Sequence, residues 1–179
     1  IILTKEEFAK SIDKNTFPGA QGGALNNQIA AKAVCFKEAL TTEYQEYAKQ
    51  ILNNAKSLAN SFQDQGLRVV SGGTENHLVL VDTRSVDKEL TGKEAGILLN
   101  EKGITLNRNA IPFDPRSPFI TSGIRMGTPA VTTCGMKEDE LTQVGYLISE
   151  ILKNRSDESK LNELEEQVRS LAKSFQPYG

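Results

Sequence analysis

One arginine of this sequence is a candidate for holding a carboxylate. Arg125 alternates with apolar neighbours in Ser122-Gly123-Ile124-Arg125-Met126-Gly127, a segment that has the pattern of a short strand flanked by glycines. A guanidinium fixed in such a strand offers a planar fork of N–H donors to a carboxylate. An ion pair with an internal acid, or a side chain in solvent, would explain the same residue. Arg116, beside Asp114, is expected to be a solvated loop charge.

A glycine pair is a candidate for contacting a phosphate. Gly22 and Gly23 follow Phe17-Pro18-Gly19, where proline and glycine disfavour regular structure, and they precede a predicted helix. A helix start presents unpaired N–H groups and a partial positive charge to an anion. A tight turn between two helices is the alternative interpretation.

The remaining reactive side chains favour structural roles. His77 opens a predicted strand and is expected to be a hydrogen-bonded strand-end residue, while Cys35 is expected to pack on the apolar face of a helix. Cys134 has no base beside it, and nothing in the sequence brings it to His77 as a nucleophile pair would require. One histidine and two distant cysteines cannot supply the four ligands of structural zinc.

Helices and a short sheet must position these residues. Apolar stripes with helical spacing predict helices at residues 4–14, from just after Gly23 to about 40, at 42–66, at 91–103 and around the stripes 141–151 and 161–175. Capping boxes mark three of the starts, at Thr4 with Glu7, Thr42 with Gln45, and Thr91 with Glu94.

Short apolar, β-branched runs predict the strands. Residues 67–70 and 77–81 are expected to form an antiparallel pair, residues 104–106 a third strand, and residues around 121–126 a brief further one. Four of the six prolines lie between Asn107 and Pro129, so an ordered loop is expected there. The pattern is that of an α/β protein.

Composition excludes several classes of protein. The chain has 179 residues, 25% charged and 38% hydrophobic, and this length can bury a core without disulfides or metal. A net charge of −2 gives no field that would gather nucleic acid or anionic lipid, and no apolar run approaches the roughly 20 residues of a membrane span. Because the chain begins Ile1-Ile2-Leu3 without a methionine, we expect it to be the interior of a longer protein.

Several segments, read together in their order along the chain, resemble one enzyme family. They are Phe17-Pro18-Gly19 with Gln21-Gly22-Gly23, the helix 29–34, Ser71-Gly72-Gly73-Thr74 with Asn76-His77-Leu78-Val79, residues 90–95 (LTGKEA), and residues 107–125 (NRNAIPFDPRSPFITSGIR). The chain is similar to serine hydroxymethyltransferase (glycine hydroxymethyltransferase), a pyridoxal-phosphate enzyme with the fold-type I architecture of aspartate aminotransferase.

The resemblance implies the C-terminal portion of such an enzyme. Residues 1–40 would be the trailing part of the large cofactor-binding domain, and residues 41–179 a small C-terminal domain with helices packed on a short antiparallel sheet. The lysine that forms the Schiff base would lie upstream of Ile1, so we expect no catalytic residue in this chain and no activity of the chain alone. The large-domain remnant cannot close a core by itself and should leave an exposed apolar surface.

The resemblance also implies roles for particular residues. Arg125 matches the arginine that holds the carboxylate of serine or glycine. Gly22 and Gly23 match glycines whose backbone reaches the phosphate of pyridoxal 5'-phosphate in the neighbouring subunit of a homodimer or tetramer. The positions that match contacts to the cosubstrate tetrahydrofolate are Asn109, Ser117, Pro118 and Phe119. A cytoplasmic enzyme is expected, or an organellar form of it, with no nucleic-acid or membrane partner.

The sequence departs from the family pattern at a few positions. Ala24 replaces a common proline, Asn26-Asn27 replaces a Glu-His pair, and Cys134 replaces an arginine. Two other functions stay open. A threonine aldolase of the same fold type would not need the folate contacts, and a non-catalytic interaction module would use neither cofactor nor folate.

Overall fold

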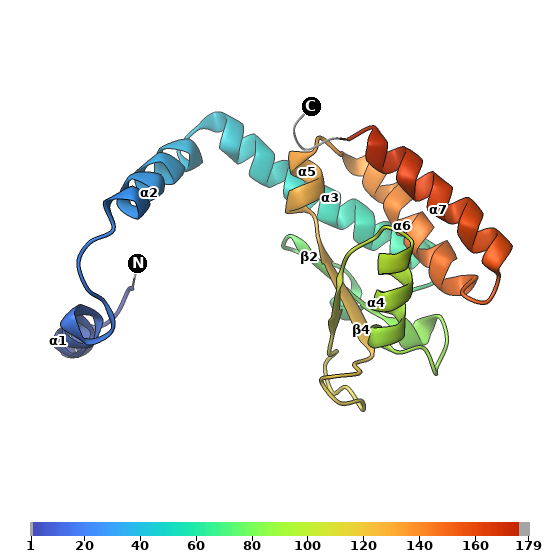
Figure 1. The fold of residues 1–179 in the computed structure, drawn as a ribbon, viewed down its shortest axis with the longest axis horizontal. Coiled ribbons are helices and arrows are strands. Elements are labelled where there is room, and N and C mark those ends of the chain that lie inside the picture. Colours follow the sequence, from blue (N-terminus) through green and yellow to red (C-terminus); the bar gives the residue numbers. More distant parts are fainter. Residues whose placement is uncertain (1, 176–179) are drawn as a thin grey trace. The chain divides into compact units, whose positions relative to one another are not determined.

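The chain divides into two units, each described here by itself. The computed structural model describes residues 2–175, and the units are Ile1–Gln45 and Glu46–Gly179 (Figure 1). The boundary falls inside the long helix α3 (Thr42–Asp64).

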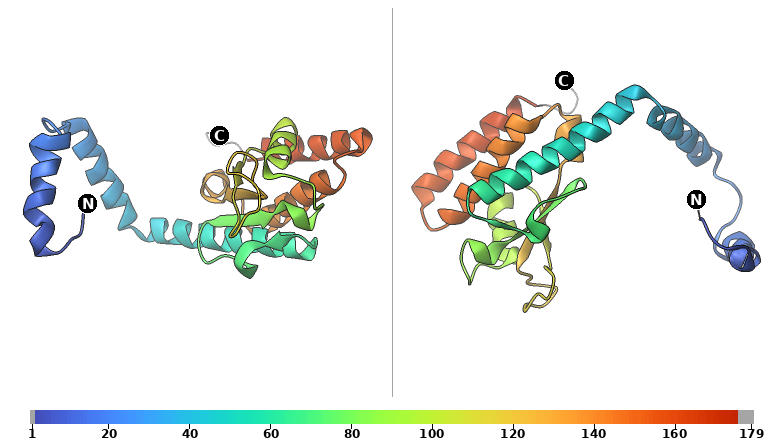
Figure 2. Two further views of the ribbon diagram at one scale, coloured as in Figure 1. Left: turned by 90° about the horizontal axis from the view of Figure 1, so that it is seen from below. Right: turned by 180° about the vertical axis from the view of Figure 1, so that it is seen from behind.

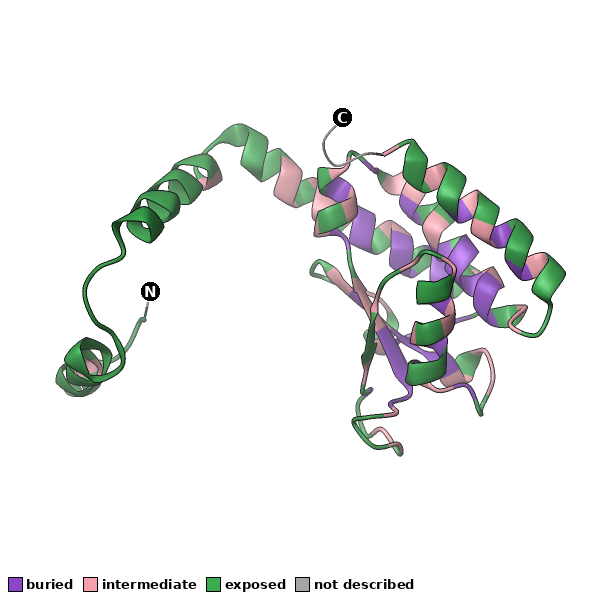
Figure 3. Ribbon diagram, viewed as in Figure 1, coloured by how far each residue is buried: buried purple, intermediate pink, exposed green. Residues whose placement is uncertain are grey.

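The first unit is helical and has no core. It consists of α1 (Glu6–Lys14), an irregular turn η1 (Asn15–Ala20) and α2 (Asn26–Ala39). None of the described residues of these elements is buried, as the green ribbon in Figure 3 shows. Large apolar side chains are exposed throughout this unit, namely Ile2, Leu3, Phe8, Phe17, Leu25, Ile29, Val34, Phe36 and Leu40. The exposed apolar surface expected of residues 1–40 is therefore present.

The predicted helix starts are only partly right. The capping box of Thr91 and Glu94 is present at the start of α4 (Gly92–Glu101). The first helix begins at Glu6 and has no side-chain cap, so the predicted box at Thr4 is wrong. At α3 the cap is Thr41, whose hydroxyl accepts a hydrogen bond from the Tyr44 N–H at 3.2 Å. The capping residue stands immediately before the first helical residue, and Thr42 is already helical.

The second unit contains a four-stranded antiparallel sheet. Its strands are β1 (Arg68–Val69), β2 (Leu78–Asp82), β3 (Asn107–Asn109) and β4 (Gly123–Gly127), in the order β1-β2-β4-β3. The expected pairing of the first two strands is confirmed, with Val69 opposite Val81. Short 3-10 turns follow these two strands, η2 (Val70–Gly72) and η3 (Thr83–Ser85).

The strand predicted at 104–106 is wrong. The Ile104 N–H bonds to the Leu99 carbonyl at 2.8 Å, across Gly103 with its positive φ of 86°. This bond closes the end of helix α4, so the apolar residues that follow form the connection and the strand begins only at Asn107. Their apolar character comes from packing, since Ile104 and Leu106 lie against the core.

Helices that precede and follow strand β4 in the sequence enclose the core of the second unit. The C-terminal part supplies α5 (Pro129–Thr133), which the sequence did not predict, α6 (Glu138–Lys153) and α7 (Glu158–Lys173). Helices α6 and α7 lie side by side (Figure 2), and α4 contacts α6. Pro129 ends the predicted loop, but proline also fits the first turn of a helix, where its missing N–H is not needed.

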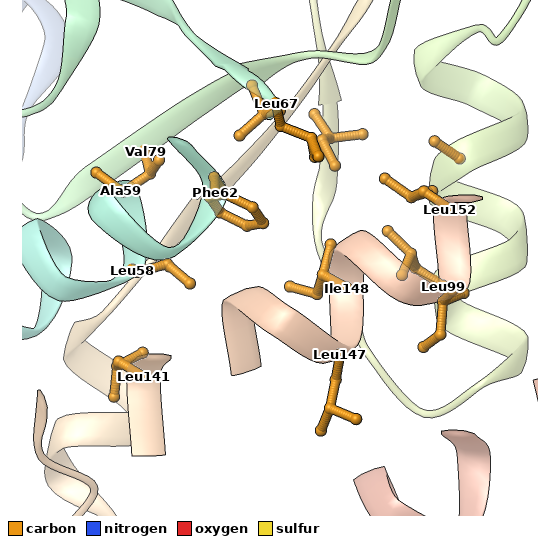
Figure 4. Packing of buried hydrophobic residues seen from close by; sticks show 14 of the residues in the cluster. Leu58, Ala59, Phe62, Leu67, Val79, Leu99, Leu141, Leu147, Ile148 and Leu152 are labelled. Atoms are coloured by element: carbon orange, nitrogen blue, oxygen red, sulfur yellow. The ribbon is translucent and has the colours of Figure 1, made fainter. Parts of the chain in front are cut away.

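The core joins the sheet to these helices. Figure 4 shows side chains from α3, β2, α4 and α6 in one cluster, among them Phe62, Val79, Leu99, Ile148 and Leu152. Each of these is less than 2% exposed. Burying one such side chain contributes about 1.5–3 kcal/mol. One face of the sheet is thus fixed against the helices, which gives the side chains on its other face a rigid support.

Candidate functional site

Strand β4 presents Arg125 on the face of the sheet that points away from the core. Successive strand residues point to opposite faces, and Ile124 is fully buried in the core. In register, Arg125 stands between Leu80 of β2 and Asn107 of β3. Its side chain is partly buried, and within residues 2–175 no hydrogen bond or ion pair engages its guanidinium. Pairing with an internal acid, one of the alternatives for this residue, is not found there.

An open cleft of about 690 Å³ lies next to the Arg125 side chain. The β2 residues Leu78 and Leu80 line it together with the loop 70–76. A small molecule with a carboxylate fits such a cleft with its charge at the guanidinium and its carbon atoms near the leucines. We call this cleft, which Arg125 helps to line, the Arg125 cleft.

The loop that lines the cleft has an uncommon backbone. Ser71, Gly72 and Gly73 have positive φ angles of 66°, 69° and 151°, a conformation that glycine adopts readily and serine rarely. Thr74 donates a hydrogen bond to the Leu78 carbonyl at 2.6 Å and fixes the end of the loop on β2. The two predicted strands imply a connection here, but nothing in the sequence places it at a cleft. The adjacent glycines were the available signal of its uncommon backbone.

The predicted folate-contacting residues lie on β3 and on the loop that joins it to β4. Asn109 ends β3 opposite Gly123, and its side-chain amide donates to the Ala110 carbonyl at 2.7 Å. Ser117, Pro118 and Phe119 are exposed on the loop, Phe119 by 77%. Because β3 pairs with β4, the structure places Asn109 on the strand adjacent to the one that carries Arg125.

The same loop is fastened to the body of the unit by Arg116. Its guanidinium donates to the Leu90 and Lys88 carbonyls, at 2.8 Å each. The expectation of a solvated loop charge is therefore wrong. A guanidinium can bridge two backbone carbonyls from an exposed loop, a role that a sequence does not distinguish from solvation.

Asp114 closes the loop from within. Burial opposes ionisation of its carboxyl group, but hydrogen bonds from the Ser122 hydroxyl and from the N–H groups of Arg116, Ser122 and Ile111 outweigh burial and lower the pKa of Asp114 to about 2. The carboxylate is thus charged at neutral pH and accepts all four bonds. Sequence reasoning noted Asp114 only as a neighbour of Arg116.

The glycine pair belongs to the first unit. Gly22 and Gly23 are exposed, and a Cβ built on either would meet no atom within 4 Å. Helix α2 begins at Asn26, so the pair precedes its first residue by a short connection instead of adjoining it. Both glycines are thus exposed, with free space where a side chain would begin.

The other reactive residues do not form a site among residues 2–175. His77 is exposed, and its carbonyl accepts from the Thr128 N–H at 3.1 Å, as expected of a strand-end residue. Cys35 is exposed on α2 and not packed, because this helix has no core to face. Cys134 is partly exposed at the end of α5. No group of three potential metal ligands occurs in the described part of the chain, and no described helix is long and apolar enough for a membrane span.

Comparison with known protein families agrees with the resemblance. The family model described as serine hydroxymethyltransferase matches residues 3–148, which include the glycine pair, the Arg125 cleft and the loop closed by Asp114. Helix α7 lies beyond the matched range. Since the match covers well over half of its length, this chain belongs to the serine hydroxymethyltransferase family.

Proposed function

We propose that this chain is the C-terminal portion of a fold-type I, pyridoxal-phosphate-dependent glycine hydroxymethyltransferase. The complete protein would interconvert serine and glycine and transfer a one-carbon unit to tetrahydrofolate. Residues 1–40 would complete the large domain, and residues 41–179 would form the small one. The observation that carries the proposal is the guanidinium of Arg125, which faces an open cleft and has no internal partner within residues 2–175.

Arg125 would hold the carboxylate of the amino acid through two parallel N–H···O bonds. Its backbone is fixed on both sides by the ladders of β2 and β3, so the point from which the side chain extends is in place before the substrate arrives. A carboxylate held here, together with an amino group held at the cofactor, would restrict rotation about the α-carbon and so orient the bond to be broken there. Positioning of this kind can lower a reaction barrier by several kcal/mol.

The residues that this chain offers to the cofactor fit a supporting role. Gly22 and Gly23 are exposed, and their N–H groups would meet the cofactor phosphate held by a neighbouring subunit. The bound cofactor supplies an electron sink for bonds broken at the α-carbon. The lysine that holds the cofactor covalently would lie outside this chain, and we expect the 179-residue chain alone to be inactive.

The folate would lie along the loop between β3 and β4. Phe119 offers an exposed aromatic ring, Ser117 a hydroxyl and Asn109 an amide, while Pro118 stiffens the backbone between the first two. A loop already ordered before binding loses less conformational entropy when it meets a flat ring system. Serine or glycine at Arg125 and folate at this loop would meet along the paired strands β3 and β4.

A folate titration of the complete protein tests this function. With pyridoxal phosphate bound and serine in excess, we expect glycine formation to require tetrahydrofolate and to saturate with it. Cleavage of threonine at a rate indifferent to folate would favour a threonine aldolase instead. If the protein bound the cofactor but catalysed neither reaction, a non-catalytic module would be favoured.

A further inference from the structure

We infer that Asp114 is a positioning residue for folate, which holds the loop between β3 and β4 in the conformation that presents Ser117, Pro118 and Phe119. The inference rests on the proposed function, because it concerns the folate contacts of that site. The Asp114 carboxylate bonds to its own loop and would act without contacting folate.

The contacts of Asp114 connect the two ends of the loop. One carboxylate oxygen, Oδ1, accepts from the Arg116 N–H at 3.0 Å and from the Ser122 hydroxyl at 2.7 Å. The other, Oδ2, accepts from the Ser122 N–H at 2.8 Å and from the Ile111 N–H at 3.2 Å. Ile111 lies near the start of the loop and Ser122 at its end, so a single carboxylate sets the span that the segment 117–119 crosses.

The backbone of the loop needs such a restraint. Phe113 and Thr121 have positive φ angles of 55° and 60°, which are disfavoured for residues with a side chain. Each is the neighbour of a residue in the carboxylate network, Asp114 in one case and Ser122 in the other. The exposed Phe119 is not held by packing of its own. Its position therefore depends on the closed loop beneath it.

Further contacts attach the closed loop to helix α4. The first two N–H groups of α4, those of Gly92 and Lys93, donate to the Thr121 and Ile120 carbonyls at 3.0 Å each. A Cβ on Gly92 would lie 2.3 Å from the Gly123 carbonyl oxygen, so only glycine allows the helix to come this close. The end of the loop is thus fixed on a rigid element, and Asp114 transmits that order to the start.

The position of Arg125 does not depend on this network. Its strand is held by the ladders of β2 and β3. Asp114 bonds to Ser122, the residue before β4, and to no residue of β4 itself among residues 2–175. Loss of the carboxylate network should therefore weaken folate binding and leave amino-acid binding intact. Substitution of a residue with a merely structural role would weaken both folate binding and amino-acid binding.

Calorimetry on the complete protein with pyridoxal phosphate bound can separate these effects. Glycine is titrated first, and 5-formyltetrahydrofolate is then titrated in saturating glycine. For Asp114→Asn, whose amide cannot accept all four bonds, we expect the folate Kd to rise about tenfold, equivalent to about 1.4 kcal/mol. The glycine Kd should change by less than about twofold, which is under 0.5 kcal/mol. Asp139→Asn, at an exposed position of α6, is the matched control and should change neither constant.

A second variant keeps the test decisive if Asp114→Asn does not fold. Ser122→Ala removes one of the four bonds and retains the backbone N–H, so the folate Kd should rise about threefold with the glycine Kd unchanged. Unchanged folate binding in both variants, or an equal loss of glycine and folate binding, would overturn the inference while the proposed function stood. A wild-type protein that bound glycine but not folate would contradict the proposed function itself, and the inference with it.

Discussion

Both units of the chain have helices with apolar stripes, but the apolar side chains are exposed in the first unit and buried in the second. The stripe of α2 is exposed, with Ile29 at 53%, Phe36 at 54% and Leu40 at 83%. The stripe of α3 beyond the unit boundary is buried, with Leu58 at 2% and Phe62 at 0%. An apolar stripe therefore predicts that a helix has a face to bury, and only the rest of the fold determines whether this chain supplies the cover.

This difference has an energetic consequence. Helices of the length of α1 and α2 are marginal in water without tertiary packing. The second unit has a continuous core that extends from the sheet to α7 and should unfold cooperatively. We expect the first unit to contribute little to the free energy of unfolding of this chain.

A pair of phenylalanine substitutions tests the contrast most strongly. Phe62→Ala should lower the free energy of unfolding by about 3–5 kcal/mol, because it removes a fully buried ring and leaves a cavity. Phe36→Ala makes the same chemical change at an exposed position and should alter the free energy by less than about 0.5 kcal/mol. Urea unfolding of the 179-residue chain, followed by circular dichroism, gives both values. Comparable losses in the two variants would contradict the division into a unit with a core and one without.

The next largest effect concerns the chemistry of the second unit. In the complete protein, Arg125→Lys keeps the positive charge and loses the planar fork, so kcat/KM for serine should fall about 100-fold, equivalent to about 2.7 kcal/mol. Steady-state turnover at saturating tetrahydrofolate measures it. Arg108→Lys, an exposed neighbour on β3, is the control and should leave turnover near that of the wild type. Serine kinetics unchanged by Arg125→Lys would remove the central residue of the proposed site.

Sequence reasoning recovered the elements better than the connections between them. The antiparallel pairing of β1 with β2 followed from β-branched runs separated by turn residues, and the capping box at Thr91 from residue spacing alone. The strand expected at 104–106 does not form, because the Ile104 N–H donates to the Leu99 carbonyl and ends helix α4 there. Such a bond depends on where the helix ends, which a periodic pattern leaves uncertain by a residue or two.

The candidate site was recovered in part for a related reason. Arg125 could be selected because charge within an apolar strand is uncommon, whereas the bonds of Asp114 and Arg116 join residues whose proximity only the folded loop creates. The lining of the Arg125 cleft by loop 70–76 likewise follows from the pairing of β2 with β4. Local chemistry is visible in a sequence, but the partners that a loop brings together are not.

The smallest predicted effect on stability comes from removing a helix cap, and each unit offers one such cap. Thr91 caps α4, which packs in the core of the second unit, and its hydroxyl accepts from the Glu94 N–H at 3.1 Å. Thr41 caps the start of α3 in the first unit. Thr91→Ala should lower the free energy of unfolding by about 1 kcal/mol, the usual contribution of a cap.

Thr41→Ala removes an equivalent hydrogen bond but should leave the free energy of unfolding unchanged, because the helix end that it caps is outside the cooperative core. Its effect should appear instead as faster hydrogen exchange at the amide of Tyr44, whose N–H loses its acceptor. Amide exchange measured by NMR on both variants distinguishes the two cases. If Thr41→Ala lowered the global stability as much as Thr91→Ala, the start of α3 would be coupled to the core, and the boundary between the units would have to lie nearer the N-terminus.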